Sequence, residues 1–211
     1  MTKKDPWPGA FAAYGAAFRQ IKKNPEPALL YIGAYTLFTI VSLVLQGQTS
    51  ATQHGHVLYE DVAVFIFLLA LPVYGLAVAD RRAISIAEFM RFDLKKYLTL
   101  VAVTVLVILI VGTSLLLFIV PAIWTLAWFS VANYAAVDKR LGPINALKES
   151  KRLARAHLSK VWGIFGTSIL LNVPMFLLLH VPYIGIAVYQ FFTLLTLSAF
   201  AVLYRWLQHN H

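Results

Sequence analysis

The chain of 211 residues is 60% hydrophobic and 13% charged, and its mean hydropathy is +0.72. Because about a quarter of the residues in a soluble domain are charged, this composition excludes an ordinary water-exposed surface. The absence of cysteine excludes disulfides and cysteine-ligated metals, and the interleaving of the net charge of +9 with apolar runs excludes a nucleic-acid-binding patch.

The first predicted element is an amphipathic helix over residues 8–23. Its apolar residues recur at spacings of three and four, as on one face of a helix: Phe11, Tyr14, Phe18 and Ile21. Its basic residues lie off that stripe: Arg19, Lys22 and Lys23. A helix that is apolar on one side and basic on the other is typical of the membrane interface.

Six apolar runs without Lys, Arg, Asp or Glu make up most of the chain. They cover residues 27–46, 62–79, 98–119, 121–137, 161–181 and 183–204. A helix needs about 17–25 apolar residues to cross the hydrocarbon core, and these runs lack the alternation of a barrel strand. We therefore predict an all-α integral membrane protein, a single polytopic domain over residues 1–211 with six transmembrane helices.

Residues 98–137 form one apolar stretch that is too long for a single crossing. As one helix it would reach about 60 Å, roughly twice the membrane core. A hairpin is therefore required. Its turn is expected between Gly112 and Pro121, since proline can open a helix and disfavours helix in the preceding residue.

Two further basic segments, over residues 85–97 and 143–160, are predicted to be amphipathic helices. In the first, Ser85 and Glu88 fit a capping box, in which two residues satisfy each other's free backbone amides. The second begins with Pro143, a residue suited to a helix start. Its apolar stripe, interrupted by Lys151, consists of Ile144, Leu147, Ala154, Leu158 and Val161.

The linkers that lead into these two helices are similar. Residues 77–89 read AVADRRAISIAEF and residues 135–147 read AAVDKRLGPINAL, so both pass from an apolar helix through an aspartate and two basic residues. The chain is interpreted as three tandem units, each an interfacial amphipathic helix followed by a two-span hairpin. Shared physical demands on any basic linker would produce the same similarity.

All lysines and arginines fall on one side of the six-span arrangement. They lie in residues 1–26, 80–97 and 138–160 and at Arg205, whereas residues 47–61 have none. Because basic loops stay in the cytoplasm, both termini are expected to be cytoplasmic in a multi-pass protein of the cell membrane.

Residues 119–166 resemble a bacterial family of small multi-span proteins. The shared features are a proline-led span, an acidic-basic loop with Gly142, the segments ALKES (146–150) and RLA (152–154), and a basic tail into the next span. The family is related to the membrane domain of glycerophosphodiester phosphodiesterases and includes stand-alone members without assigned function. The resemblance implies a six-helix bacterial membrane domain, although Ala122 replaces the usual glycine. It implies no catalytic residue, because the chain shows no soluble catalytic domain.

The leading hypothesis is a non-enzymatic membrane module. Its basic helices would engage the lipid bilayer through anionic headgroups, or would bind a partner membrane protein or a second copy of the chain. Each basic residue near an anionic leaflet gains about 1 kcal/mol. The candidate binding residues are Lys148, Lys151, Arg152, Arg155, Lys160, Arg19, Lys22 and Lys23. Charges that serve only to set the topology would show the same pattern.

The alternative is a transporter or permease subunit for a small solute that passes near Asn172 and Gln190. The candidate polar residues inside the predicted spans are Asn133, Asn172 and Gln190. Asn172, next to a kink expected at Pro174, could instead hydrogen-bond a neighbouring helix.

A third hypothesis, an enzyme acting on lipid, would require Asp80, Asp138 and His157 to meet. No cofactor or metal site is predicted. The outer-loop group of His54, His56, Glu60 and Asp61 matches the spacing of no standard zinc site.

Overall fold

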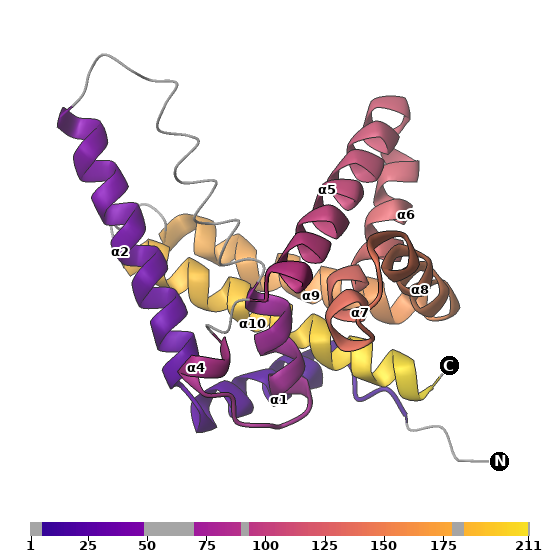
Figure 1. Ribbon diagram of the computed structural model, residues 1–211, viewed down its shortest axis with the longest axis horizontal. Coiled ribbons are helices and arrows are strands. Elements are labelled where there is room, and N and C mark those ends of the chain that lie inside the picture. The colour runs from indigo at the N-terminus through magenta and orange to yellow at the C-terminus, as the bar shows by residue number, and fades with distance from the viewer. Residues whose placement is uncertain (1–5, 49–69, 90–92, 179–183, 211) are drawn as a thin grey trace.

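The computed structural model describes residues 6–48, 70–89, 93–178 and 184–210, and Figure 1 shows their arrangement. Every regular element in these ranges is a helix, which confirms the predicted all-α class. The helices are α1 (Ala10–Lys23), α2 (Glu26–Gln48), a helix at Ala70–Ala79, α4 (Ile86–Phe89), α5 (Leu94–Leu117), α6 (Ile119–Phe129), α7 (Ala132–Asp138), α8 (Pro143–Ala156), α9 (Leu158–Leu178) and α10 (Ile184–His209).

Three helical segments in the described ranges are long and apolar enough to cross a membrane: Leu94–Leu117, Ile119–Asp138 and Ala187–His209. They correspond to the predicted spans at 98–119, 121–137 and 183–204. The chain thus has the helix lengths and composition of a membrane protein. The predicted spans at 62–79 and 161–181 extend outside the described residues, so the number of six crossings stays a prediction.

The turn between α5 and α6 lies at Phe118, inside the predicted range. Its extended backbone (φ −162°, ψ 145°) separates the two helices, and its N–H donates to the Ser114 carbonyl at 2.9 Å. The span predicted at 121–137 is divided into α6 and α7 near Ser130, whose hydroxyl donates to the Ala127 carbonyl at 3.0 Å. Hydroxyl bonds of this kind compete with the helical ladder and bend helices.

The helix predicted over 85–97 is wrong as a continuous element. α4 is a single turn, and α5 begins separately at Leu94. The reason is Asp93, an N-cap whose carboxylate accepts hydrogen bonds from the N–H groups of Lys95 and Lys96. One half of the predicted capping box is present, since the Glu88 N–H donates to the Ser85 hydroxyl at 3.1 Å.

The helix predicted over 143–160 is also divided. α8 begins at Pro143 as expected but ends at Ala156, and the non-helical His157 (φ −138°, ψ 39°) separates it from α9. Lys160, predicted as part of this basic helix, therefore lies in the first turn of α9.

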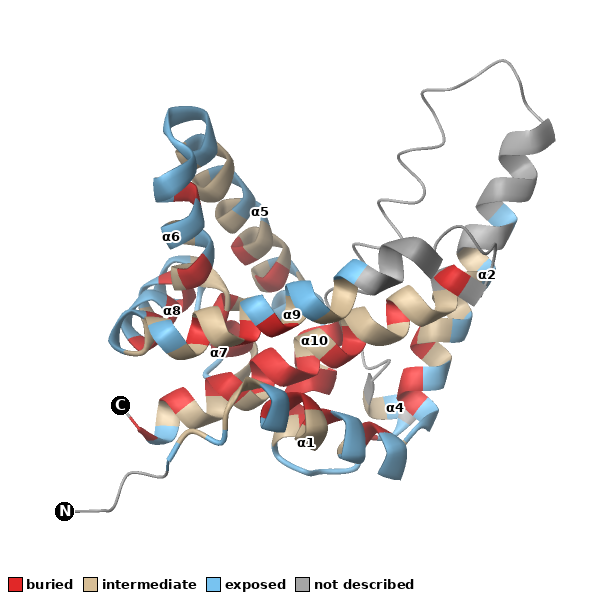
Figure 2. Ribbon diagram, turned by 180° about the vertical axis from the view of Figure 1, so that it is seen from behind, coloured by how far each residue is buried: buried red, intermediate tan, exposed pale blue. Residues whose placement is uncertain are grey.

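Helix α10 lies at the centre of the core. It contacts α1, α2, α7, α8 and α9, and the buried residues in Figure 2 gather along it and its neighbours. The helix at Ala70–Ala79 approaches α10 closely at Gly75, where an added Cβ would lie 3.1 Å from Ala201 and 3.2 Å from Tyr134. Small residues at such positions let helix backbones come together.

The α5–α6 hairpin stands away from this core. In Figure 1, α2 and α5 rise from the lower part of the molecule, whereas α9 and α10 run across it. The tip of the hairpin, residues 115–120, is exposed throughout, and Leu116 is 89% exposed. Such a continuous apolar surface is stable in hydrocarbon and unusual in water.

The buried faces of α1 and α8 agree in part with the predicted stripes, since Tyr14, Ile21, Leu147 and Ala154 are buried as predicted. α1 buries Ala13, Tyr14, Ala17 and Ile21, and α8 buries Ala146, Leu147, Ser150, Leu153 and Ala154. Phe11 and Ile144 were predicted to belong to the apolar stripes, but they are 65% and 64% exposed. The core side of each helix is rich in alanine because small residues allow closer helix packing.

Candidate functional site

Helix α8 is anchored to the core through its small face. The Ser150 hydroxyl is fully buried and donates to the Trp128 carbonyl at the end of α6 at 2.7 Å. On the neighbouring side, the Nζ of Lys151 lies 4.7 Å from the centre of the Trp128 ring, a cation–π contact. These two contacts fix which residues of α8 face outward.

The one carboxylate of α8 holds two basic side chains. Glu149 accepts from Nε and Nη2 of Arg152 at 2.8 and 2.7 Å, and its Oε1 lies 2.5 Å from Nζ of Lys139. These hydrogen bonds, chiefly that from Arg152, lower the pKa of Glu149 to about 2. Arg152, one of the predicted binding residues, is therefore already paired within the protein.

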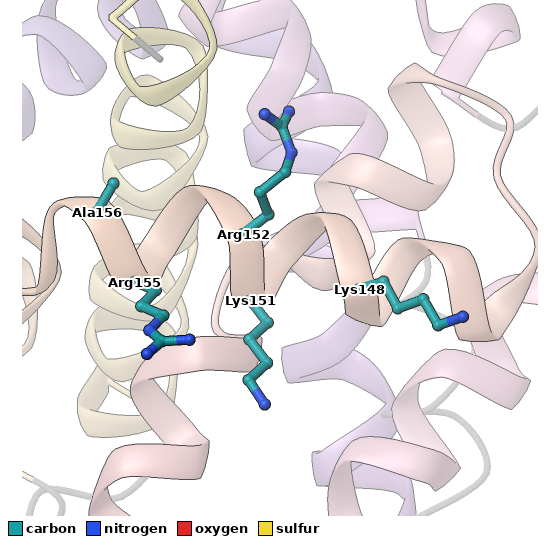
Figure 3. A pocket seen from close by; sticks show the side chains of 5 residues that line it. All are labelled: Lys148, Lys151, Arg152, Arg155 and Ala156. Carbon is teal, nitrogen blue, oxygen red and sulfur yellow. The ribbon is translucent and has the colours of Figure 1, made fainter.

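The other basic side chains of α8 form an outward ridge. Lys148, Lys151 and Arg155 are exposed and line an open depression of about 430 Å³ together with Arg152. Figure 3 shows Lys151 and Arg155 extending on one side of the helix, whereas Arg152 points to the other. Because i and i+4 share a helix face, Lys151 and Arg155 act at one place. We call Lys148, Lys151 and Arg155 the α8 ridge.

The basic residues predicted on α1 are also directed outward. Arg19, Lys22 and Lys23 are exposed, and so is Phe18 beside them. Several basic side chains form no ion pair with any carboxylate in the described part of the chain: Arg19, Lys22, Lys23, Arg81, Lys95, Arg140, Lys148, Lys151, Arg155 and Lys160. The predicted binding residues on α1 and α8, with the exception of Arg152, are thus available to an external anion.

A second charged cluster joins the ends of three helices. Arg205 of α10 donates from Nε and Nη2 to the two carboxylate oxygens of Asp80, both at 2.7 Å, and its Nη1 lies 2.7 Å from Asp138. The second oxygen of Asp138 accepts from the Tyr204 hydroxyl at 3.0 Å and from Nε2 of Gln208 at 2.8 Å. We call Asp80, Asp138 and Arg205 the helix-end triad.

Sequence reasoning considered a meeting of Asp80 and Asp138 in the enzyme hypothesis, but it missed Arg205, the residue that joins them. Asp80 and Asp138 hold matching positions in the two similar linkers, and this similarity was the available signal. The arginine that joins them lies far along the chain, at the end of the third predicted unit. His157 is not part of the cluster and packs against Trp206 with ring centroids 5.0 Å apart. The carboxylates are therefore held by a permanent cation rather than arranged around a titrating imidazole.

The polar residues predicted for a solute path are found in separate places. Gln190 is buried and accepts from the Tyr31 hydroxyl at 2.8 Å, which links α2 to α10. Asn133 contacts the Thr104 hydroxyl at 3.4 Å, which links α7 to α5.

Asn172 donates to the Ser168 carbonyl of its own helix at 2.8 Å. Asn172, for which a bond to a neighbouring helix was the alternative, therefore bonds within its own helix, whereas Gln190 and Asn133 bond to neighbouring helices.

Among the described residues no group of His, Asp and Glu is arranged to hold a metal ion. The predicted group at His54, His56, Glu60 and Asp61 lies outside the described residues. Comparisons of the chain with family models, with curated proteins and with solved structures found no match. The resemblance to the bacterial six-span family therefore stays a prediction.

Proposed function

We propose that this chain is a non-enzymatic, six-span protein of the cell membrane that binds anionic lipid headgroups through basic helices on its cytoplasmic side. Both termini lie in the cytoplasm in this proposal. The single observation that carries it is the α8 ridge, three exposed cations with no described carboxylate to neutralise them.

The anchoring of α8 supports a role beyond setting the topology. Charges that only orient the chain need no fixed position, because topology depends on how many basic residues a loop carries. Here the contacts of Ser150 and Lys151 with Trp128 hold the helix against the core, and Glu149 forms an ion pair with Arg152, which is not part of the ridge. The remaining cations are therefore presented from a rigid helix, which lowers the entropy lost on binding.

The outer surface of α1 supports the same placement. Phe18 is 46% exposed next to Arg19, and its ring contacts Phe191 of α10 with centroids 6.2 Å apart, so an aromatic ring lies between the basic residues and the face that packs on α10. This combination is typical of helices that lie in the membrane interface, with rings among the acyl chains and cations at the headgroups.

The test is the lipid composition that the purified protein retains. Protein is solubilised in micelles that contain equal amounts of phosphatidylglycerol and phosphatidylcholine, and the lipids that copurify are quantified. We expect enrichment of phosphatidylglycerol in the wild type and a clearly lower enrichment in the triple variant Lys148→Gln, Lys151→Gln, Arg155→Gln. Three charges at about 1 kcal/mol each set an upper limit of roughly a hundredfold on the change in relative affinity.

The control variants are Arg82→Gln and Lys139→Gln, which remove cations already bound to Glu88 and Glu149. These two variants should leave the enrichment of phosphatidylglycerol close to that of the wild type. Salt at about 0.5 M should reduce the enrichment in the wild type. Equal enrichment in the wild type and the triple variant would reject lipid binding by α8 and favour a partner protein. Reporter fusions that place the C-terminus outside the cell would reject the proposed topology.

A further inference from the structure

Two basic grooves lie outside the α8 ridge, each where an amphipathic segment meets the end of a later helix. The first, of about 360 Å³, is lined by Arg19, Lys23, Val78, Ala79, Arg81 and Val202 among others. The second, of about 290 Å³, is lined by Asp93, Lys95, Lys96, Leu100, Ala136, Val137 and Arg140 among others. The Asp93 carboxylate in it accepts hydrogen bonds from the backbone N–H groups of Lys95 and Lys96. We call them the α1 groove and the α5 groove.

The two grooves are built from matching parts of the two similar linkers. Val78 and Ala79 precede Asp80 and line the α1 groove, and residues 136 and 137 precede Asp138 and line the α5 groove. In both linkers the aspartate is bound by Arg205. The two grooves are therefore similar in construction, although the arginine that lines the groove follows Asp80 by one residue and Asp138 by two.

An arginine with a left-handed backbone lines each groove. Arg81 has φ of 54° and Arg140 has φ of 50°, and they are the non-glycine residues with positive φ in the described ranges. Arg81 lies just after the helix at Ala70–Ala79, where the Arg82 N–H donates to the Ala77 carbonyl at 2.9 Å. In this kind of helix end, the position that Arg81 occupies is normally glycine. A non-glycine residue destabilises the folded state in this conformation, so the two arginines lower the stability of the protein.

Each groove brings together three cations. Arg19, Lys23 and Arg81 form no ion pair with a described carboxylate, and neither do Lys95 and Arg140. Lys96, the third cation of the α5 groove, lies 3.8 Å from Asp93, a loose pair. A guanidinium beside two ammonium or guanidinium groups matches the several oxygens of a phosphate.

We propose that the two grooves are paired binding sites for the phosphate-bearing headgroup of an anionic phospholipid. The apolar residues Val202 and Leu100 line the grooves beside the cations, which suits a phosphate attached to acyl chains better than a free ion. The proposal deepens the proposed function and rests on its placement of this side of the protein at an anionic leaflet.

The test exploits the preference of left-handed positions for glycine. Arg81→Gly and Arg140→Gly remove the cation while relieving the backbone, so the variants should melt at the wild-type temperature or above it. The full chain, delipidated in detergent, is titrated with short-chain phosphatidylglycerol, and bound lipids are counted by native mass spectrometry. We expect two tightly bound lipids in the wild type, one in each single variant and none in the double variant, with each lost site weakened at least tenfold.

The matched controls Arg82→Gln and Lys139→Gln remove one cation from the same turns without touching the grooves, and should keep both lipids. Equal binding by the wild type and the double variant would overturn the proposal, as would equal losses in the controls. Binding of inorganic phosphate as tight as that of phosphatidylglycerol would overturn the assignment to lipid. The triple variant of the α8 ridge separates the two proposals, since it should lower the total enrichment of phosphatidylglycerol while retaining the two tight sites.

Discussion

Replacement of Arg205 by glutamine should destabilise the protein more than any other single loss of charge. Arg205 is bound to Asp80 by two hydrogen bonds of 2.7 Å and to Asp138 by a contact of the same length, and its side chain is 24% exposed. The variant would leave two carboxylates without their cation. Both lie at the C-terminal ends of helices, where the helix dipole already disfavours negative charge.

The expected loss follows from these contacts. A hydrogen bond to a charged group contributes about 1.5–3 kcal/mol, and breaking a well-buried ion pair by removing one partner costs about 3–5 kcal/mol. Asp138 and Asp80 keep 19% and 39% of their side-chain surface exposed, so water screens part of this cost. We expect about 3 kcal/mol, roughly a hundredfold in the unfolding equilibrium.

The assay is the free energy of unfolding in mixed micelles, measured by circular dichroism during titration with SDS. Arg155→Gln is the control, because Arg155 is exposed and unpaired among the described residues, and its loss should cost less than about 0.5 kcal/mol. Adding Asp80→Asn and Asp138→Asn to the Arg205 variant should recover much of the stability. A loss below about 0.5 kcal/mol for Arg205→Gln, or failure of the asparagines to rescue it, would refute the reasoning.

Three further predictions concern packing, polar contacts and pH. Gly75→Val should cost about 1–3 kcal/mol because its Cβ would press on Ala201 and Tyr134, whereas Gly112→Val, with nothing within 4 Å, should cost less, as thermal unfolding will show. Tyr31→Phe should cost about 1–2 kcal/mol by leaving buried Gln190 without its 2.8 Å partner, and adding Gln190→Leu should recover part of it in a double-mutant cycle. The pKa of Glu149 is about 2 in the folded protein against an ordinary value of 4.5, so its charged form stabilises the fold above pH 4.5 and this stabilisation is lost as the pH falls towards 2. The difference in free energy of unfolding between the wild type and Glu149→Gln should therefore decrease over that pH range.

The sequence predicts the helical class and several element ends because these depend on local chemistry. Pro143 opens α8, and the turn at Phe118 falls inside the predicted range, since proline and the thickness of the membrane constrain the chain locally. Asp93, the N-cap of α5, was the sequence signal for a new helix inside the segment 85–97. A prediction that considers only the spacing of apolar residues does not detect such a cap.

The faces of the amphipathic helices could not be predicted from hydrophobicity alone. Ile144 and Phe11 are more hydrophobic than four alanines of the same helices that are buried: Ala13, Ala17, Ala146 and Ala154. Hydrophobicity separates core from surface in water, but in a membrane the outer surface is also apolar, and close packing then selects small side chains. Alanine spacing alone would not have identified the buried faces either, because Ala12 of α1 and Ala156 of α8 are exposed.

The helix-end triad connects the fold to the proposed function through the acidic residues rather than the basic ones. Asp80 and Asp138 adjoin the α1 and α5 grooves in the chain, and as free carboxylates they would weaken the attraction of each groove for an anion. Arg205 binds both, so a single cation from α10 cancels one of the two negative charges near the grooves and holds both carboxylates in hydrogen bonds. Glu149 and Arg152 neutralise each other on α8 in the same way. The positive character of this side therefore depends on where the carboxylates are held, and Arg205→Gln should weaken phosphatidylglycerol binding in both grooves although Arg205 lines neither.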